Sequence, residues 1–121
     1  MTRLAVLILT YNEEKNIADC IRTAGFADEV VVVDSGSSDR TRELAESLGA
    51  RCVVHPMEEG FAAQRNFALT ATDADWVFYL DADERFAAAT WQTVRALVTH
   101  HDAPQRQAGR SPQLRQTGVV L

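Results

Sequence analysis

Four short apolar runs recur along the chain, and each is followed by a segment with helical periodicity. The runs are Leu4–Leu9, Glu29–Val33, Arg51–Val54 and Trp76–Leu80. The second run contains four consecutive valines, and such continuous apolar strands are typical of a parallel sheet that is covered on both faces. The β-α-β-α order therefore predicts an α/β fold, a Rossmann-like three-layer sandwich with a mainly parallel central sheet.

Apolar side chains recur at helical spacing after each of these strands. One stripe predicts a helix over Ile17–Ala24, and we expect Asn12 to cap it. A second helix is expected around Leu44–Leu48, with a glycine directly after it to close it. The same periodicity predicts helices over Phe61–Thr70 and from about residue 88 to residue 100.

The composition sets bounds on the size of the domain and on its partners. The 121 residues are 46% hydrophobic and 24% charged, which fits one soluble globular domain with a single core. The net charge is -5 at pH 7, so the broad positive surface of a nucleic-acid-binding protein is not expected. The apolar run at residues 4–9 is too short to span a bilayer and lacks the flanks of a secretory signal. We therefore expect a cytoplasmic protein.

The composition changes at Ala103. From there to Leu121 the chain has two prolines, four glutamines, three arginines and no acidic residue. A segment of this kind lacks the apolar periodicity needed to pack on a core. We therefore expect residues 1–102 to form the folded domain and residues 103–121 to be a disordered tail.

The two cysteines do not indicate a disulfide or a metal site. Cys20 and Cys52 have 31 residues between them, without the short spacing that metal ligands show. Both sit in apolar patterns, so we expect buried free thiols in the core.

Polar clusters follow three of the predicted strands. They are Thr10–Glu13, Asp34–Thr41 and Asp81–Asp83. In a parallel α/β sheet, ligands bind beyond the carboxyl ends of the strands, so these clusters are expected to converge. The Asp-Ala-Asp sequence suggests a site for a hard cation such as Mg²⁺ or Mn²⁺, which often binds substrate phosphates together with one or two carboxylates. A lone Asp-x-Asp is also common where a strand ends in a turn.

Four segments resemble, in their order and spacing, the nucleotide-sugar-binding half of family 2 glycosyltransferases with the GT-A fold. The segments are LAVLILTYNEEKNIADCI, EVVVVDSGSSDRTRELA, GFAAQRNFAL and DWVFYLDADER, within roughly residues 3–95. The last two are similar to those of bacterial enzymes that glycosylate lipopolysaccharide core or other cell-envelope acceptors. The resemblance implies a GT-A sandwich of which this chain holds a truncated, N-terminal part.

The resemblance implies roles for side chains on the nucleoside side of the site. Thr10, Tyr11 and Glu13 follow the first strand, where the family's loop packs on the base, and Tyr11 offers a ring for stacking. The alternative for Tyr11 is a half-buried aromatic that closes the sheet. Asp34 would accept hydrogen bonds from the base or ribose, and Gly36 would let the backbone turn close to the ligand.

The other implied roles concern the diphosphate and the metal. Arg65 lies where the family places a basic residue toward the nucleotide, although a solvated helix-face arginine or a partner for a carboxylate is an equal alternative. Asp81 would reach the ribose directly or through the metal, and Asp83 would be the direct ligand of Mg²⁺ or Mn²⁺. Asp39 and Thr41 are interpreted instead as capping residues of the second helix.

The resemblance implies an inverting transferase that takes a sugar from a nucleoside diphosphate, most commonly of uridine. The acceptor would be a cell-envelope glycan or glycolipid, with peripheral contact of the enzyme with the inner face of the membrane. Such enzymes take their catalytic base from a C-terminal half, and no residue here can be assigned to that role. We therefore expect a fragment, a truncated product or a module that another chain completes.

Two other classes of protein stay open. One is a nucleotide-sugar-binding protein without transfer activity, which the missing base favours. The other is a phosphatase of the haloacid dehalogenase type, whose nucleophile sits in an Asp-x-Asp after the first strand. Here the motif follows the fourth strand, which disfavours the phosphatase.

Overall fold

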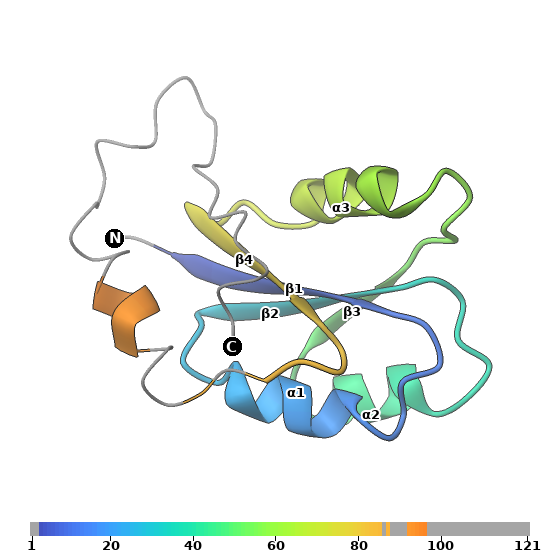
Figure 1. Cartoon of the computed structure of the whole chain (residues 1–121), viewed down its shortest axis with the longest axis horizontal. Helices are drawn as coiled ribbons and strands as arrows, with labels where there is room; N and C mark the ends of the chain where they lie inside the picture. Colours follow the sequence, from blue (N-terminus) through green and yellow to red (C-terminus); the bar gives the residue numbers. More distant parts are fainter. Residues whose placement is uncertain (1–2, 86, 88–91, 97–121) are drawn as a thin grey trace.

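Strands and helices alternate along the chain as the apolar pattern predicts (Figure 1). The computed structural model describes residues 3–85, 87 and 92–96. The elements are β1 (Leu4–Thr10), α1 (Ile17–Thr23), β2 (Glu29–Asp34), α2 (Thr41–Ser47), β3 (Arg51–Val54), α3 (Phe61–Thr70) and β4 (Trp76–Asp81). The predicted α/β class and all four predicted strands are confirmed.

The four strands are parallel and lie in the order β3-β2-β1-β4. The chain builds the sheet outward from β1 to β3 and then crosses back to place β4 on the other side of β1. Because the strand order reverses between β1 and β4, a ligand crevice is expected beyond the carboxyl ends of these two strands. Leu9 of β1 is in register with Asp81 of β4, so the polar residues after both strands emerge at the same level.

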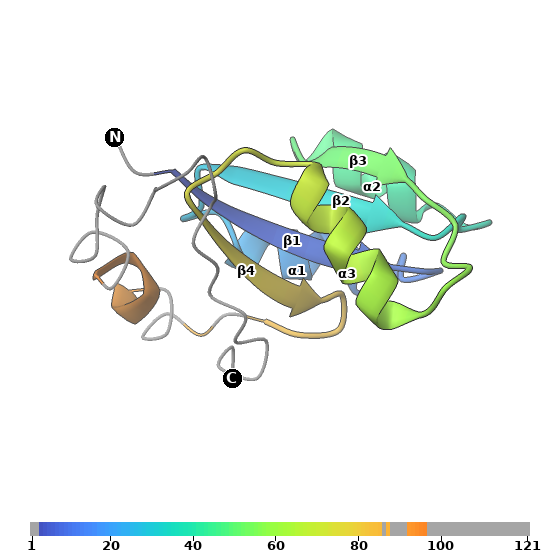
Figure 2. The ribbon, with the colours of Figure 1, turned by 90° about the horizontal axis from the view of Figure 1, so that it is seen from above.

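Helices cover both faces of the sheet. Figure 1 shows α1 and α2 on one face and α3 on the other, and Figure 2 shows α3 crossing over the strands. Successive side chains of β1 serve the two faces in turn. Leu4, Val6 and Ile8 belong to the core cluster beneath α1 and α2, whereas Ala5 and Leu7 belong to the cluster beneath α3.

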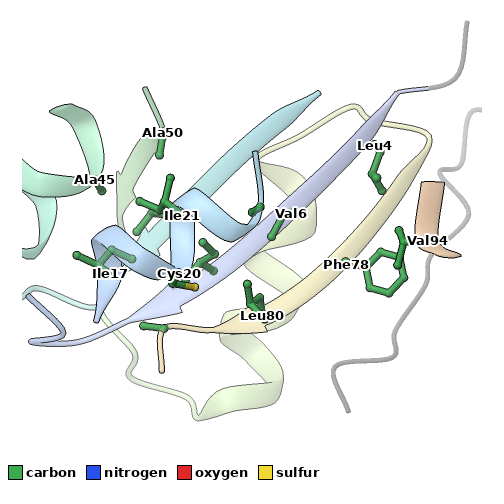
Figure 3. Close-up of a cluster of buried hydrophobic side chains, with 14 of the residues drawn as sticks. Leu4, Val6, Ile17, Cys20, Ile21, Ala45, Ala50, Phe78, Leu80 and Val94 are labelled. Atoms are coloured by element: carbon green, nitrogen blue, oxygen red, sulfur yellow. The ribbon is translucent and has the colours of Figure 1, made fainter. Parts of the chain in front are cut away.

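The cluster beneath α1 carries the buried stripe that the sequence predicts. Ile17, Cys20 and Ile21 of α1 lie over the sheet (Figure 3) and are at most 5% exposed. Both cysteines are free thiols, as predicted, but Cys52 on the edge strand β3 is only half-buried. Burial raises the pKa of the Cys20 thiol to about 12 and that of the Cys52 thiol to about 11.

The predicted cap of α1 is wrong. Asn12 has a left-handed backbone with φ of 52°, and α1 begins only at Ile17. The Asn12 side chain instead accepts a hydrogen bond from the Ser38 amide at 2.8 Å, because it faces the neighbouring loop rather than the helix start. Asn is one of the few residues that tolerate this backbone conformation. Asp39 does satisfy the Thr41 amide at the start of α2, although Arg40 and not Asp39 is the N-cap residue. Thr41 does not cap the helix, since it is the first helical residue and its hydroxyl accepts a hydrogen bond from the Glu13 amide.

Part of the fourth predicted helix is described. Residues 92–96 are helical, and Val94 is buried in the cluster beneath α1, next to Phe78 in Figure 3. The rest of that predicted helix and the predicted tail at 103–121 lie outside the described residues. Within the described ranges, no helix is both long enough and apolar enough to cross a membrane.

Candidate functional site

A cavity of about 270 Å³ lies at the carboxyl edge of the sheet, where the strand order reverses between β1 and β4. Five of the side chains that the sequence proposed for the site line it: Thr10, Tyr11, Glu13, Asp81 and Asp83. Ser35 and Ala82 belong to the clusters that were expected to converge, whereas the sequence did not predict Leu9, Met57, Phe61 and Gln64. The cavity therefore brings the ends of β1 and β4 together with the segment that leads into α3.

The turn after β4 holds its two aspartates toward solvent. The Glu84 amide donates to the Asp81 carbonyl at 2.8 Å, and the Asp81 amide donates to Glu84 Oε1, also at 2.8 Å. These reciprocal bonds close the turn and leave Asp81 and Asp83 exposed. Within the described part of the chain, neither aspartate carboxylate accepts a hydrogen bond or pairs with a cation.

Two side chains hold this turn, Arg85 from within it and Cys20 from α1. Arg85 Nη1 donates to the carbonyls of Ala82 and Glu84 at 3.0 and 2.8 Å. The Cys20 thiol, from inside the core, donates to the Asp81 carbonyl at 3.6 Å. The backbone that carries the two aspartates is therefore held from the core and from its own C-terminal side.

The loop after β1 is fixed by the loop after β2. The Asn12 amide donates to Ser37 Oγ at 2.7 Å, and the Glu13 amide donates to Thr41 Oγ1 at 2.8 Å. These bonds satisfy backbone donors that lie beyond the end of the strand. Tyr11 is carried on this braced backbone and is 58% exposed, so it does not close the sheet as a half-buried aromatic.

Asp34 is completely buried and does not line the cavity. Its carboxylate accepts hydrogen bonds from Thr10 Oγ1 at 2.9 Å, the Gly36 amide at 2.9 Å, and the Ser37 amide and hydroxyl at 2.7 and 2.5 Å. Arg42 Nε lies 3.8 Å from it. Asp34 thus fastens the β2 loop to β1 and contacts the cavity-lining Thr10 from behind, but it does not itself line the cavity.

Gly36 also lies outside the cavity lining. Its φ is 105°, and a Cβ built there would meet nothing within 4 Å. The glycine is therefore required by the left-handed backbone of the turn and not by a close approach of protein atoms.

Arg65 is not brought to the cavity either. Its guanidinium carbon lies 5.6 Å from the centre of the Tyr79 ring, and the Tyr79 hydroxyl donates to the Arg65 carbonyl at 3.0 Å. Arg65 Nε is buried without a hydrogen-bond partner among the described residues. The cation is thus held against β4 by its attraction to the aromatic face, rather than against the exposed aspartates.

The charged side chains among the described residues that line the cavity are all acidic. Glu13, Asp81 and Asp83 contribute carboxylates, and no Lys, Arg or His is among the described residues that line it. Two exposed, unengaged carboxylates suit a hard cation that completes its shell with phosphate and water. Among the described residues, no group of three or more His, Cys, Asp or Glu side chains is arranged to hold a metal, so a cation here would need such outside ligands.

A protein-family model described as "Glycosyl transferase family 2" matches residues 5–109. The chain belongs to glycosyl transferase family 2. Among curated proteins, it is 36% identical over 103 residues to the lipopolysaccharide core biosynthesis glycosyltransferase LpsC of Rhizobium meliloti. This match covers 82% of the chain and 38% of LpsC. The chain spans 29% to 38% of the length of such curated relatives.

Solved structures confirm the predicted GT-A type of fold. Glucosyl-3-phosphoglycerate synthase from Mycobacterium tuberculosis, crystallised with Mn²⁺, uridine diphosphate and glucosyl-3-phosphoglycerate, is 28% identical with a TM-score of 0.62. That match covers 69% of this chain and 36% of the synthase. TarS of S. aureus is 27% identical with a TM-score of 0.69, over 83% of this chain and 20% of TarS.

Proposed function

We propose that this family 2 domain binds a nucleoside diphosphate sugar, with uridine as the nucleoside, together with a divalent cation at Asp81 and Asp83. One observation carries the proposal. The two carboxylates are exposed and unengaged in the described structure, and they share a cavity with the exposed ring of Tyr11. The synthase that resembles this chain was crystallised with Mn²⁺ and uridine diphosphate, which favours the same pairing of metal and nucleotide here.

Electrostatics explains why the cation is needed. Like charges about 4 Å apart repel by about 4 kcal/mol at an effective dielectric constant near 20. A diphosphate that enters beside Asp81 and Asp83 meets several such charges, and the described lining offers no basic side chain to offset them. A bound Mg²⁺ or Mn²⁺ would reverse this repulsion and stabilise the negative charge of the departing nucleoside diphosphate.

The side chains then divide the work by position. Tyr11 would stack on the base, while Thr10 and Glu13 would shape the cavity beside it. Asp83 would hold the cation, and Asp81 would reach the cation or the ribose. Asp34 and Gly36 would support the cavity indirectly, by fixing the β2 loop. Arg65 would support it through its contact with Tyr79 of β4.

For the whole protein we propose inverting sugar transfer to a cell-envelope glycan or glycolipid, on the cytoplasmic side and in peripheral contact with the inner membrane. The name of LpsC, a lipopolysaccharide core biosynthesis enzyme, favours this acceptor class. The acceptor site and the catalytic base would come from outside the strands and helices described above. General-base catalysis contributes roughly 10²- to 10⁴-fold in rate, so this chain alone would transfer sugar slowly at best.

The second candidate is a nucleotide-sugar-binding fragment without transfer activity. It is favoured because each carboxylate among the described residues that line the cavity is assigned above to the donor or its cation, which leaves none of them for the catalytic base. Binding and turnover would then separate, with donor bound and not transferred.

A panel of nucleoside diphosphates and their sugars tests these proposals. We expect calorimetry to show that uridine diphosphate binds in the presence of Mn²⁺ and binds far more weakly in the presence of a chelator. Transfer to a lipid-linked or saccharide acceptor, measured beside hydrolysis of the donor, separates the two candidates. Rapid transfer by the 121-residue chain would rule out the binding-only candidate.

A further inference from the structure

The helix α3 places an aromatic side chain at a core-facing position where no core lies beneath it. Phe61, Gln64 and Ala68 stand at i, i+3 and i+7, the spacing of one helix face. Gln64 and Ala68 are 2% and 0% exposed, whereas Phe61 is 67% exposed. The reason is that Phe61 lies one turn nearer the helix start, where the cavity takes the place of the sheet.

This position is fixed rather than loose. Gln64 Nε2 donates to the His55 carbonyl at 2.7 Å, so its Oε1 is the acceptor toward His55 Nδ1 at 2.8 Å. The His55 ring is stacked on Phe67 with 3.7 Å between the ring centres. These contacts tie the first turns of α3 to the end of β3, and Phe61 is carried on that turn.

Exposed apolar side chains are concentrated at this cavity. Among the described residues, the exposed large hydrophobic ones are Tyr11, Val54, Met57 and Phe61. All of them except Val54 line the cavity. Tyr11 comes from the β1 loop, while Met57 and Phe61 come from the β3–α3 segment, so apolar surface enters the cavity from two separate parts of the chain.

We propose that Met57 and Phe61 form an apolar wall that binds the base of the nucleotide together with Tyr11 and increases the contribution of the base to affinity. The inference rests on the proposed function. The occupant is argued from what shares the cavity. A ligand that meets both this wall and a cation at Asp81 and Asp83 combines a flat apolar group with a group that binds a cation, such as a diphosphate. A nucleoside diphosphate has that chemistry. Gln64, which lines the same cavity, keeps the wall in place.

Calorimetry on the full chain with two ligands tests the wall. Uridine diphosphate carries the base, and inorganic diphosphate does not, while both bind through Mn²⁺. We expect Phe61→Ala to raise the Kd of uridine diphosphate by about 5- to 100-fold, the range typical of losing one base–aromatic contact, and to leave the Kd of inorganic diphosphate unchanged. Phe61→Trp should restore uridine diphosphate binding, because it restores a ring.

Val54→Ala is the matched control, since Val54 is exposed but lies outside the cavity lining. It should leave both affinities unchanged. If Phe61→Ala bound uridine diphosphate like the wild type, the wall would serve another occupant and the inference would be wrong. An equal loss for both ligands would also overturn it, because Phe61 would then act on the shape of the whole site. If the wild type bound inorganic diphosphate with Mn²⁺ but no nucleotide, or neither ligand, the proposed function itself would fail, and the inference with it.

Discussion

Arg85 Nη2 donates a hydrogen bond to Asn16 Oδ1 at 3.3 Å and thereby joins the turn after β4 to the segment that starts α1. Asn16 in turn donates through Nδ2 to Glu13 Oε1 at 3.0 Å, and Glu13 lines the cavity. A chain of side-chain hydrogen bonds therefore connects the loop that carries Tyr11 with the turn that carries Asp83. The two parts of the site hold their relative positions through these contacts.

Replacing this arginine should loosen the turn without unfolding the domain. We expect Arg85→Met to weaken Mn²⁺-dependent binding of uridine diphosphate by about 3- to 10-fold, the equivalent of roughly one net hydrogen bond. Arg85→Lys should recover part of the loss, since it keeps a donor and the charge. Calorimetry gives the affinities and thermal unfolding gives the stability. A large fall in thermal midpoint, with the affinity of the remaining folded protein unchanged, would contradict a positioning role.

The buried thiol of Cys20 should resist modification. Because burial raises its pKa to about 12, the reactive thiolate is scarce at pH 8. We expect a thiol reagent to label half-buried Cys52 first and Cys20 only on unfolding, with mass spectrometry of the peptides as the measurement. Equal labelling of both in the folded protein would contradict the packing of α1 on the sheet.

The same raised pKa predicts a pH dependence of stability. The thiol titrates near 9 in the unfolded chain and near 12 in the folded one, so the unfolded state releases its proton first as the pH rises. The free energy of unfolding should therefore fall as pH rises from about 9 toward 12. Urea titrations at several pH values measure the slope, and Cys20→Ala should make it shallower. An unchanged slope in that variant would contradict the assignment.

Asp34 should matter first for stability. It is fully buried and accepts four hydrogen bonds, so Asp34→Ala leaves several buried donors unpaired. We expect a loss of about 2–4 kcal/mol in the free energy of unfolding, measured by urea titration. Nucleotide binding should weaken indirectly through the loops, while its dependence on Mn²⁺ persists. A variant of wild-type stability would contradict the bracing role.

The sequence located the ends of β1 and β4 well, and for a physical reason. Apolar runs that stop at polar residues mark strand ends, and the crevice of a parallel sheet lies where the strand order reverses. Thr10 and Tyr11 on one side and Asp81 on the other therefore had to meet once the order β3-β2-β1-β4 formed. The side chains at the end of β2 lie one strand away from this reversal.

Asp34 and Arg65 do not line the cavity, because neighbouring groups of the protein engage their side chains. A sequence motif does not reveal such local contacts. Asp34 is followed by Gly36 and Ser37, whose amides lie close enough to engage its carboxylate. Arg65 is one position beyond inward-facing Gln64, which turns it toward β4 instead of the cavity. Phe61 could have been found from the sequence. It is a large aromatic residue on the same helix face as buried Gln64 and Ala68, but at the first turn of α3, which lies beyond the ends of the strands.

The dependence of nucleotide binding on a divalent cation tests the central claim most directly. Calorimetry with uridine diphosphate should give clear binding by the wild type with Mn²⁺ and little with a chelator. Asp83→Ala should remove both the Mn²⁺ dependence and most of the affinity, whereas Glu46→Ala, an exposed carboxylate change on α2, should behave like the wild type. Equal affinity of the wild type with Mn²⁺ and with chelator would contradict the account.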